Sequence, residues 1–444
     1  MIGSAPPKGR LDPLASPALI DRFAHLPAAT SPELMAPLLQ DALFAGSGEV
    51  VESCARPRAE LSGSACALQY PLRVRDHSGS SRDVLVLGTL FATSGAAAAF
   101  AAETLAPLAE AAAARRTAVS RTFGVIDGLD LAASVFPLSA ALPTLVRACD
   151  TTRMAEVMQG LFQRPVGVCD VELVAFRRTR GCVLRYRLDL ADHPVVYGKI
   201  GYRARSGDVH GALHQLSRTV PRNRRAISYP QMLGDVAELE LTLWGELKGV
   251  RPDPGDGPAL DAMIVAATDV AAALHTSGVS SGDPRTLVDE LGRAREAVDS
   301  MAPYAPELAQ WLRECVDGVA RDAASRESRQ AALAHGDLTP SQLLLHDGAV
   351  SVLDFDKLCQ AEPALDLGRF AAYLRFALAK RGRVEPRASA DAFLGAYAAA
   401  GGRDVAPADV DLYARAYLVR MAARSWLQLK PARLGVALDA LRHL

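Results

Sequence analysis

The sequence predicts a protein of the α+β class that is built from more than one folding unit. The chain has 444 residues, and domains of roughly 100 to 200 residues would divide that length into about two to four units. Two strand-rich stretches come first, and a mostly helical stretch follows them. Hydrophobic residues make up 50% and charged residues 22%, which is the ordinary composition of globular domains.

Charge and cysteine content exclude several classes of protein. Lys and Arg number 49 against 50 Asp and Glu, a balance that supports neither a nucleic-acid-binding coat nor a polybasic membrane anchor. The seven cysteines form no Cys-x-x-Cys pair, so neither a disulfide framework nor a zinc ribbon is expected. The N-terminus lacks the apolar run of a signal peptide. We therefore expect a cytoplasmic protein that binds neither nucleic acid nor membrane.

The uncharged stretch 84–102 resembles a membrane span only in its length. Thr93, Ser94 and Gly95 divide it into a Val/Leu-rich half and an Ala-rich half. This pattern indicates a strand, a turn and a helix.

The N-terminal third predicts a tail and an accessory domain. Residues 1–32 are rich in Pro, Ala and Ser and are expected to form a loose tail. Residues 33–155 are expected to form an α+β accessory domain that begins with a helix, since Leu34, Leu38 and Leu39 recur at helical spacing. Its other elements are expected at 50–55, 65–75 and 83–91 (strands), 95–120 (helix), 118–137 (short β-segments) and 141–162 (helix).

Residues 156–249 are expected to form a small strand-rich lobe, and residues 250–444 a helical catalytic lobe. Turn residues around Gly181 and Asp192 separate three β-type runs, as in a meander. The expected strands are 171–177, 182–190, 194–202, 226–233 and 237–244, with a helix over 207–217. Beyond residue 249, apolar residues recur at helical spacing, and helices are expected near 285–300 and 305–325.

The two strand-rich units resemble each other. Residues 66–72 match residues 182–188 at a constant offset, and an Asp-His pair follows each at that same offset. Two interpretations stay open: convergent strand composition, or a degenerate copy of one small lobe. Thr89 stands in the first unit where Lys199 stands in the second, and no catalytic loop follows the first unit. The first unit therefore reads as a cap, a dimerisation module or a substrate-shaping module.

The segment 333–370 carries the richest chemistry in the chain. Two short apolar runs, joined through Asp347 and Gly348, predict a tight hairpin. Such a hairpin brings Asp337, Gln342 and Asp354 to the same end. Two carboxylates and an amide carbonyl form an oxygen site suited to Mg²⁺.

This arrangement is what phosphoryl transfer requires, because that reaction needs positioning and neutralisation of phosphate charge more than covalent chemistry. One aspartate would accept the proton of an attacking hydroxyl, and a second would hold a metal that bridges the phosphates. A lysine on another lobe would hold the nucleotide phosphates, and Lys199 lies in the third strand of the small lobe, where such a lysine belongs.

The segment resembles the catalytic core of the aminoglycoside phosphotransferase and choline kinase family, which is related to the protein kinases. The family pattern His-x-Asp-x-x-x-x-Asn is met at His335 and Asp337 and, with a substitution, at Gln342. The resemblance covers roughly residues 165–444 and implies a bilobal protein-kinase-like fold. Gln in place of Asn, together with an extra N-terminal domain, is also similar to bacterial maltokinases.

The resemblance implies a role for each site residue and implies ATP and Mg²⁺ as cofactors. Asp337 corresponds to the catalytic base, Gln342 and Asp354 to the metal ligands, and Lys199 to the phosphate-binding lysine. Structural support of the site falls to His335, Asp356 and Asp366. Cofactor binding further involves Arg180, Gly181, Glu246 and Leu247, from the hairpin over the phosphates and the interlobe hinge.

Two departures from the family pattern weaken the prediction. Gln342 is one methylene longer than Asn, so a metal would sit differently. The helix after Lys199 offers no glutamate to pair with the lysine, and Asp208 is the nearest acidic residue. These departures support an alternative, a nucleotide-binding pseudokinase that acts as a regulatory or scaffold protein.

Two residue roles stay open in the sequence. Asp356 fits either a second metal ligand or a partner of Lys357. Arg177 and its neighbours fit either phosphate binding or a solvated turn.

The sequence thus predicts an ATP-dependent kinase that phosphorylates a hydroxyl group of a small molecule. A sugar or sugar-derived substrate is favoured by analogy alone. The connection between the two strand-rich units has no Gly/Ser-rich linker, so residues 33–155 are expected to dock on the small lobe. A homodimer through the N-terminal domain is also compatible with the sequence.

Overall fold

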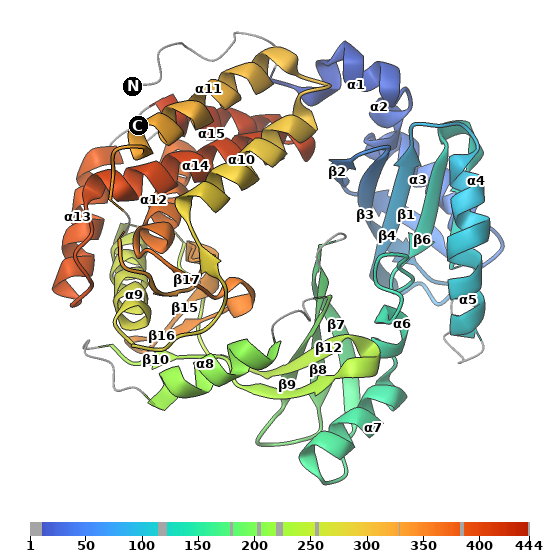
Figure 1. The fold of residues 1–444 in the computed structure, drawn as a ribbon. Helices are drawn as coiled ribbons and strands as arrows, with labels where there is room; N and C mark the ends of the chain where they lie inside the picture. The colour runs from blue at the N-terminus through green and yellow to red at the C-terminus, as the bar shows by residue number, and fades with distance from the viewer. Residues whose placement is uncertain are drawn as a thin grey trace.

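The computed structural model describes residues 11–113, 122–177, 181–201, 206–218, 225–253, 257–327, 329–381 and 386–442. The chain forms three parts: a first sheet with its helices, a second sheet with its helices, and a helical lobe (Figure 1). The α+β class expected from the sequence is confirmed.

Residues 11–31 do not form the loose tail that their composition suggested. They contain the helices α1 (Pro17–Arg22) and α2 (Leu26–Ala29), which bury Leu19, Phe23 and Leu26 almost completely. The hydroxyl of Ser16 caps α1 by accepting a hydrogen bond from the amide of Leu19. Burial of three large apolar side chains fixes this segment, despite its prolines.

The first sheet forms the accessory domain. Its strands run in the order β1-β3-β4-β6-β5, and β2 pairs with β3. In β3, every second residue from Cys66 to Val74 is buried, which is the alternation of a sheet with one covered face. The elements are α3 (Pro32–Leu39), β1 (Val50–Cys54), β2 (Arg58–Ser62), β3 (Ala65–Arg75), β4 (Ser81–Phe91), α4 (Ala96–Phe100), α5 (Ala106–Ala113), β5 (Phe123–Ile126) and β6 (Leu131–Val135).

The second sheet forms the small lobe, in the order β7-β8-β9-β12-β11. The expected boundary at residue 155 falls inside α7, whose Met154 and Met158 pack in the core of this sheet. The small lobe therefore begins before α6. Its elements are α6 (Leu145–Ala148), α7 (Thr151–Phe162), β7 (Val168–Arg177), β8 (Gly181–Leu188), β9 (Val195–Ile200), α8 (Ser206–Arg218), β11 (Met232–Val236) and β12 (Leu241–Gly245).

The two sheets share their topology and their register. Thr89 of β4 pairs with Ala132 of β6, and Lys199 of β9 pairs with Thr242 of β12, at a constant offset. Each final strand follows a 3₁₀ turn that ends in a residue with positive φ, Asp130 in one unit and Glu240 in the other.

Each of the two sheets contains a buried tyrosine whose hydroxyl donates a hydrogen bond to the backbone in the same way. The hydroxyl of Tyr70 donates to the carbonyl of Ala29 at 2.8 Å, and that of Tyr186 donates to the carbonyl of Ala148 at 2.9 Å. Both rings lie against a glycine, and a Cβ on Gly88 would approach the Tyr70 ring to 2.8 Å. The accessory domain and the small lobe therefore resemble each other in these contacts as well as in topology and register.

The helical lobe carries two small sheets and the remaining helices. Strand β10 (Ile227–Ser228) adds to the sheet of β15 and β16. Both helices expected from the sequence, near 285–300 and 305–325, are present. The elements are α9 (Gly257–His275), β13 (Pro284–Arg285), α10 (Leu287–Met301), α11 (Pro306–Ala323), β14 (Ala332–Ala334), β15 (Leu343–His346), β16 (Ala349–Val352), β17 (Cys359–Ala361), α12 (Ala364–Ala379), α13 (Pro386–Ala399), α14 (Pro407–Leu427) and α15 (Pro431–Arg442).

Among the described residues, α9 alone is long and apolar enough to cross a membrane. It contributes Met263, Val270 and Leu274 to the hydrophobic core, and core helices satisfy the same criteria. All seven cysteines are free thiols.

The accessory domain contacts both of the other parts, and not only the small lobe as the sequence suggested. Phe136 packs edge-on against Phe176 of β7, with ring centroids 6.2 Å apart. On the other side, Glu60 of β2 forms an ion pair with Arg424 of α14 at 3.2 Å. The hydroxyl of Ser16 donates to the carbonyl of Tyr304 at 2.6 Å. This bond joins the start of α1 to the loop between α10 and α11, which lie next to each other (Figure 1).

We predict that deleting residues 1–143 will make the remaining chain aggregate, because Phe176 and the face of α14 would lose their cover. The exposed area should be that of a domain interface, on the order of 600 Å² or more. Size-exclusion chromatography with light scattering measures the outcome. A truncated protein that stayed soluble, monomeric and fully active would show that the lobes do not need this domain.

Candidate active site

The loop that follows β14 carries the candidate catalytic residue and depends on one glycine. Gly336 has φ of +72°, and a Cβ there would lie 2.0 Å from the carbonyl oxygen of Lys357. Only glycine fits this close approach of two backbone segments. The loop is thereby pressed against residues 355–357, and Asp337 is placed next to Lys357.

Asp366, in the first turn of α12, holds the loop from beneath. Its buried carboxylate accepts hydrogen bonds from the amides of His335 at 2.7 Å and Gly336 at 2.9 Å. Burial by itself raises the pKa of this carboxyl, but the hydrogen bond and charge of His275 outweigh it and lower the pKa below its usual value. Asp366 therefore remains an acceptor at neutral pH.

His335 serves the same loop. Its Nε2 atom lies 2.9 Å from the carbonyl oxygen of Leu353, and its Nδ1 atom accepts from the amide of Asp337 at 3.3 Å. Both ring nitrogens thus face the backbone, as expected for a bracing role.

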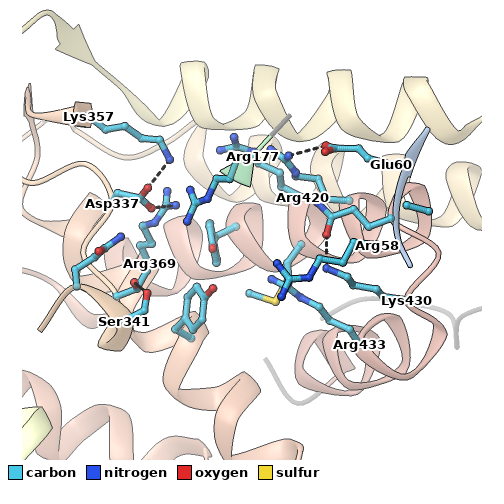
Figure 2. Close-up of a pocket in the computed structure, with 18 of the residues that line it drawn as sticks. Arg58, Glu60, Arg177, Asp337, Ser341, Lys357, Arg369, Arg420, Lys430 and Arg433 are labelled. Carbon is cyan, nitrogen blue, oxygen red and sulfur yellow. Dashed lines mark hydrogen bonds and ion pairs between the residues drawn. The ribbon is translucent and has the colours of Figure 1, made fainter. Parts of the chain in front are cut away.

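Two basic side chains clamp Asp337. Lys357 donates to Oδ2 at 2.5 Å, and Arg369 of α12 forms an ion pair with Oδ1 (Figure 2). Burial raises the pKa of the Asp337 carboxyl, but the charges of Arg369 and Lys357 outweigh it and hold the pKa below its usual value. Asp337 is therefore an ionised carboxylate at neutral pH.

Lys199 reaches across from the small lobe to the second pair of carboxylates. Its Nζ atom lies 2.8 Å from Asp354 and 3.0 Å from both oxygens of Asp356. Gln342 donates from its side-chain amide to the other oxygen of Asp354 at 3.2 Å. The structure thus brings Lys199, Gln342 and Asp354 together, and it places Asp356 with them.

The charges of this group depend on one another. Burial raises the pKa of the Asp354 carboxyl, but Lys199 outweighs it and lowers the pKa. Burial raises the pKa of Asp356 to about 7, helped by the charge of Asp354 and opposed by Lys199. Burial lowers the pKa of Lys199, but the two carboxylates reverse that effect and leave the pKa raised.

This group fits a magnesium ion by the chemistry of its donors. Asp354, Asp356 and the amide of Gln342 offer oxygen atoms, the ligands that Mg²⁺ prefers, and bound Mg²⁺ usually keeps waters and phosphate oxygens as well. The described residues contain no cluster of three or more His, Cys, Asp or Glu side chains arranged as a complete metal site. A magnesium site that is completed by nucleotide phosphates would not need such a cluster.

The residues expected to bind nucleotide lie on the small lobe and after it. Gly181 begins β8 and pairs with Arg177, with φ of +135°, whereas Arg180 lies outside the described residues. Glu246 is exposed and Leu247 half-buried in the segment after β12. That segment leads to Val250, which bridges to Leu345 of the helical lobe, so it links the lobes as a hinge would.

The side chain of Asp208, the acidic residue nearest to Lys199 in the sequence, lies outside the described side chains. Among the described side chains, Lys199 forms ion pairs with Asp354 and Asp356. Trp244 is buried and donates to the hydroxyl of Thr242 at 3.0 Å, which places it in the core.

Sequence reasoning missed Arg369 as a partner of Asp337. It expected acceptor specificity to lie in the helical segments near 251–330 and 371–444 but named no individual residue there. Asp337 lies at one end of a cavity of about 320 Å³. Strands β2 and β3 of the accessory domain, the end of β7 and helices α12, α14 and α15 all contribute to its wall (Figure 2). Three arginines and a lysine within 420–433 were the available signal, but no local motif connects them to the loop at residue 337.

Comparisons with known proteins agree with this site. Residues 199–419 match the sequence profile of the phosphotransferase enzyme family. A search of curated proteins returned no match.

Solved structures resemble the chain distantly. The aminoglycoside phosphotransferase APH(3'')-Id from Streptomyces rimosus is 19% identical, with a TM-score of 0.41 over 61% of this chain and 98% of that one. A choline/ethanolamine kinase family protein from Mesorhizobium loti is 15% identical, with a TM-score of 0.42 over 58% and 89%. A spectinomycin phosphotransferase, solved with ADP and spectinomycin, is 12% identical, with a TM-score of 0.43 over 66% and 94%.

The family match includes Lys199 and every residue of the loop and clamp described above. A sheet lobe is followed by a helical lobe, and the candidate site lies between them. Residues 199–419 therefore belong to the phosphotransferase enzyme family, which indicates a phosphotransferase that acts on hydroxyl groups.

Proposed function

We propose that this protein transfers the γ-phosphoryl group of ATP to a hydroxyl group of a small molecule, a sugar or sugar derivative. The observation that carries the proposal is the position of Asp337. This ionised carboxylate lies at the end of a 320 Å³ cavity, and Gln342 lines the same cavity next to Asp354 and Lys199. An acceptor hydroxyl and a nucleotide phosphate could therefore meet beside Asp337.

Asp337 would orient the acceptor by accepting the hydrogen bond of its hydroxyl group. The clamp of Lys357 and Arg369 lowers the basicity of Asp337, which suits this role. Phosphoryl transfer passes through a loose transition state in which the hydroxyl proton need not leave early. The same two cations could stabilise negative charge that develops on the transferred group.

Lys199, Asp354 and Gln342 would hold the other side of the reaction. Magnesium, when bound, would neutralise phosphate charge there, and Asp354, Gln342 and Asp356 supply the oxygen ligands. Lys199 would then exchange its carboxylate partners for phosphate oxygens. Gly181, at the start of β8, would lie over the phosphates, and Glu246 and Leu247 would offer backbone groups to the base.

The hydroxyl groups of Thr339 and Ser341 in the cavity wall support a sugar acceptor. The sequence resemblance to maltokinases, which rests on Gln342 and the extra N-terminal domain, also favours a sugar. A cytoplasmic location is supported by the seven free thiols. Release of ADP from ATP and Mg²⁺ over a panel of sugars and aminoglycosides tests the proposal. Nucleotide binding without ADP release for any acceptor would favour the regulatory pseudokinase instead.

We predict that Asp337→Asn will lower turnover by roughly 10²-fold or more, a typical contribution of a general base. Nucleotide binding and the fold should persist, because Asn retains the shape of the side chain. Steady-state ADP release and a thermal shift with ATP and Mg²⁺ measure the two effects. The matched control is Asp347→Asn in the exposed hairpin turn, which should leave turnover unchanged. Near-normal turnover in Asp337→Asn would remove this residue from the catalytic role.

We predict that Asp354→Ala will abolish the Mg²⁺-dependent part of nucleotide binding, because it removes the carboxylate shared by Lys199 and Gln342. Asp354 has a left-handed backbone with φ of +66°, which Asn adopts more readily than Ala. Asp354→Asn therefore separates the loss of charge from backbone strain.

Gln342→Asn serves as the companion variant and should be tolerated, because the type of ligand is unchanged. Titration calorimetry of ATP with and without Mg²⁺ compares the three variants. If Gln342→Asn were as damaging as Asp354→Ala, the amide would have a role other than metal binding.

A further inference from the structure

The cavity beside Asp337 has a charge that the whole chain lacks. Eight of its lining residues are Arg or Lys and two are acidic, although the net charge of the chain is −1. The basic residues come from three parts of the fold: Arg58 from the accessory domain, Arg177 from the small lobe, and Lys357, Arg369, Arg420, Arg424, Lys430 and Arg433 from the helical lobe.

Both acidic residues of the wall already have basic partners. Asp337 pairs with Lys357 and Arg369, and Glu60 pairs with Arg424. Arg420 lies 3.9 Å from Glu290, outside the cavity wall. Within the described part of the chain, the remaining four basic residues form no ion pair with a carboxylate; these are Arg58, Arg177, Lys430 and Arg433.

Three of these four gather at the end of the cavity opposite Asp337. Figure 2 shows Arg58, Lys430 and Arg433 together on that side, whereas Lys357 lies beside Asp337. The Nε atom of Arg433 is buried and, among the described residues, has no hydrogen-bond partner. Burial lowers the pKa of Lys430, and the neighbouring charges of Arg433 and Arg58 lower it further, against a smaller opposing effect of Glu60. This end of the cavity thus holds positive charge that the protein does not neutralise.

Like charges that converge on a recess repel one another unless an anion lies between them. The reacting phosphoryl group would lie at the other end, beside Asp337 and Lys357. A second anion is therefore needed at the far end. Arginine side chains bind phosphate oxygens in a bidentate manner, and a phosphate dianion balances three cations better than a single carboxylate does.

We infer that the acceptor is a hydroxyl compound that already carries a phosphate group, which Arg58, Lys430 and Arg433 bind while the hydroxyl is presented to Asp337. The inference rests on the proposed function, since it names the acceptor class of that site. The inference also gives the accessory domain a role. Its strand β2 supplies Arg58, so the phosphate site is incomplete without this domain.

One set of ligands with a common ring tests the inference. The set compares neutral glucose with three charged derivatives: glucose 6-phosphate carries a phosphate, glucuronate a carboxylate and glucosamine a cationic amine. Ribose and ribose 5-phosphate form a second pair. Titration calorimetry on the full-length protein measures binding, with and without ADP and Mg²⁺, and ADP release measures turnover. We expect the phosphorylated members to bind at least about tenfold more tightly than the neutral ones, the value of one charge-assisted hydrogen bond or more.

The double variant Arg58→Gln with Lys430→Gln locates the site. It should weaken binding of the phosphorylated sugar at least tenfold and leave the affinity for ATP within about twofold. The matched control, Arg56→Gln with Lys380→Gln, removes two exposed cations outside the cavity wall and should change neither affinity. A loss of ATP affinity in the Arg58 and Lys430 variant would overturn the inference, because these cations would then serve the nucleotide.

The remaining outcomes separate the inference from the proposed function. Turnover of glucose or glucosamine at a higher kcat/KM than glucose 6-phosphate would overturn the inference and leave the kinase intact. A preference for glucuronate, or no binding of any phosphorylated sugar, would also overturn it. If phosphorylated sugar bound through Arg58 and Lys430 while no acceptor released ADP, the inference would stand and the proposed activity would fall.

Discussion

Two backbone amides, those of His335 and Gly336, donate to one buried carboxylate, and the candidate active site depends on that pair of hydrogen bonds. Asp366 is fixed by its place in the first turn of α12, and Arg369 follows it on the same face of the helix, three residues later. One helix therefore holds the loop from beneath and clamps the side chain of Asp337 from the side. Gly368 allows α12 to lie against α14, since a Cβ there would approach Tyr413 to 2.6 Å. This close packing lets the Arg369 guanidinium stack on the Tyr417 ring at 4.5 Å.

The accessory domain resembles the small lobe in the properties that form its sheet and differs from it in the residues that would bind nucleotide. The sheet order, the strand register and the buried tyrosine are properties that let such a sheet fold, and both domains have them. The accessory domain has Thr89 where the small lobe has Lys199. The face beside Thr89 is filled by apolar groups of α4 and its neighbours, including Phe100, Leu105 and Ala132. This packed face leaves no room for a nucleotide. The accessory domain contributes instead through its edge, where β2 lines the cavity beside Asp337.

Sequence alone could predict those parts of the site that depend on short spacing. The interval from His335 to Asp354 includes one hairpin, and the turn at Asp347 and Gly348 fixes how the strands return, so Asp337, Gln342 and Asp354 could be placed together. Arg58 could not be placed, because nearly 280 residues of chain separate it from Asp337. The helices at 17–29 were missed for another reason: composition suggested a tail, although Ser16 is a good N-cap and Leu19 and Phe23 recur at helical spacing. Their burial depends on partners far along the chain, such as the loop at Tyr304.

Electrostatics link these observations. A chain with balanced charge can place an excess of one sign in a cavity only if other regions carry the opposite sign, so net charge says nothing about the ligand of such a site. Here the two carboxylates of the cavity wall are both paired, and one of them, Glu60, also ties the accessory domain to α14. The carboxylate of Glu60 is thus paired with Arg424 and does not form an ion pair with Arg58 or Lys430. The pairing of Glu60 with Arg424 therefore both joins the accessory domain to the helical lobe and leaves the cavity positively charged. An acceptor that supplied the missing negative charge would also stabilise the contacts among the three parts of the fold.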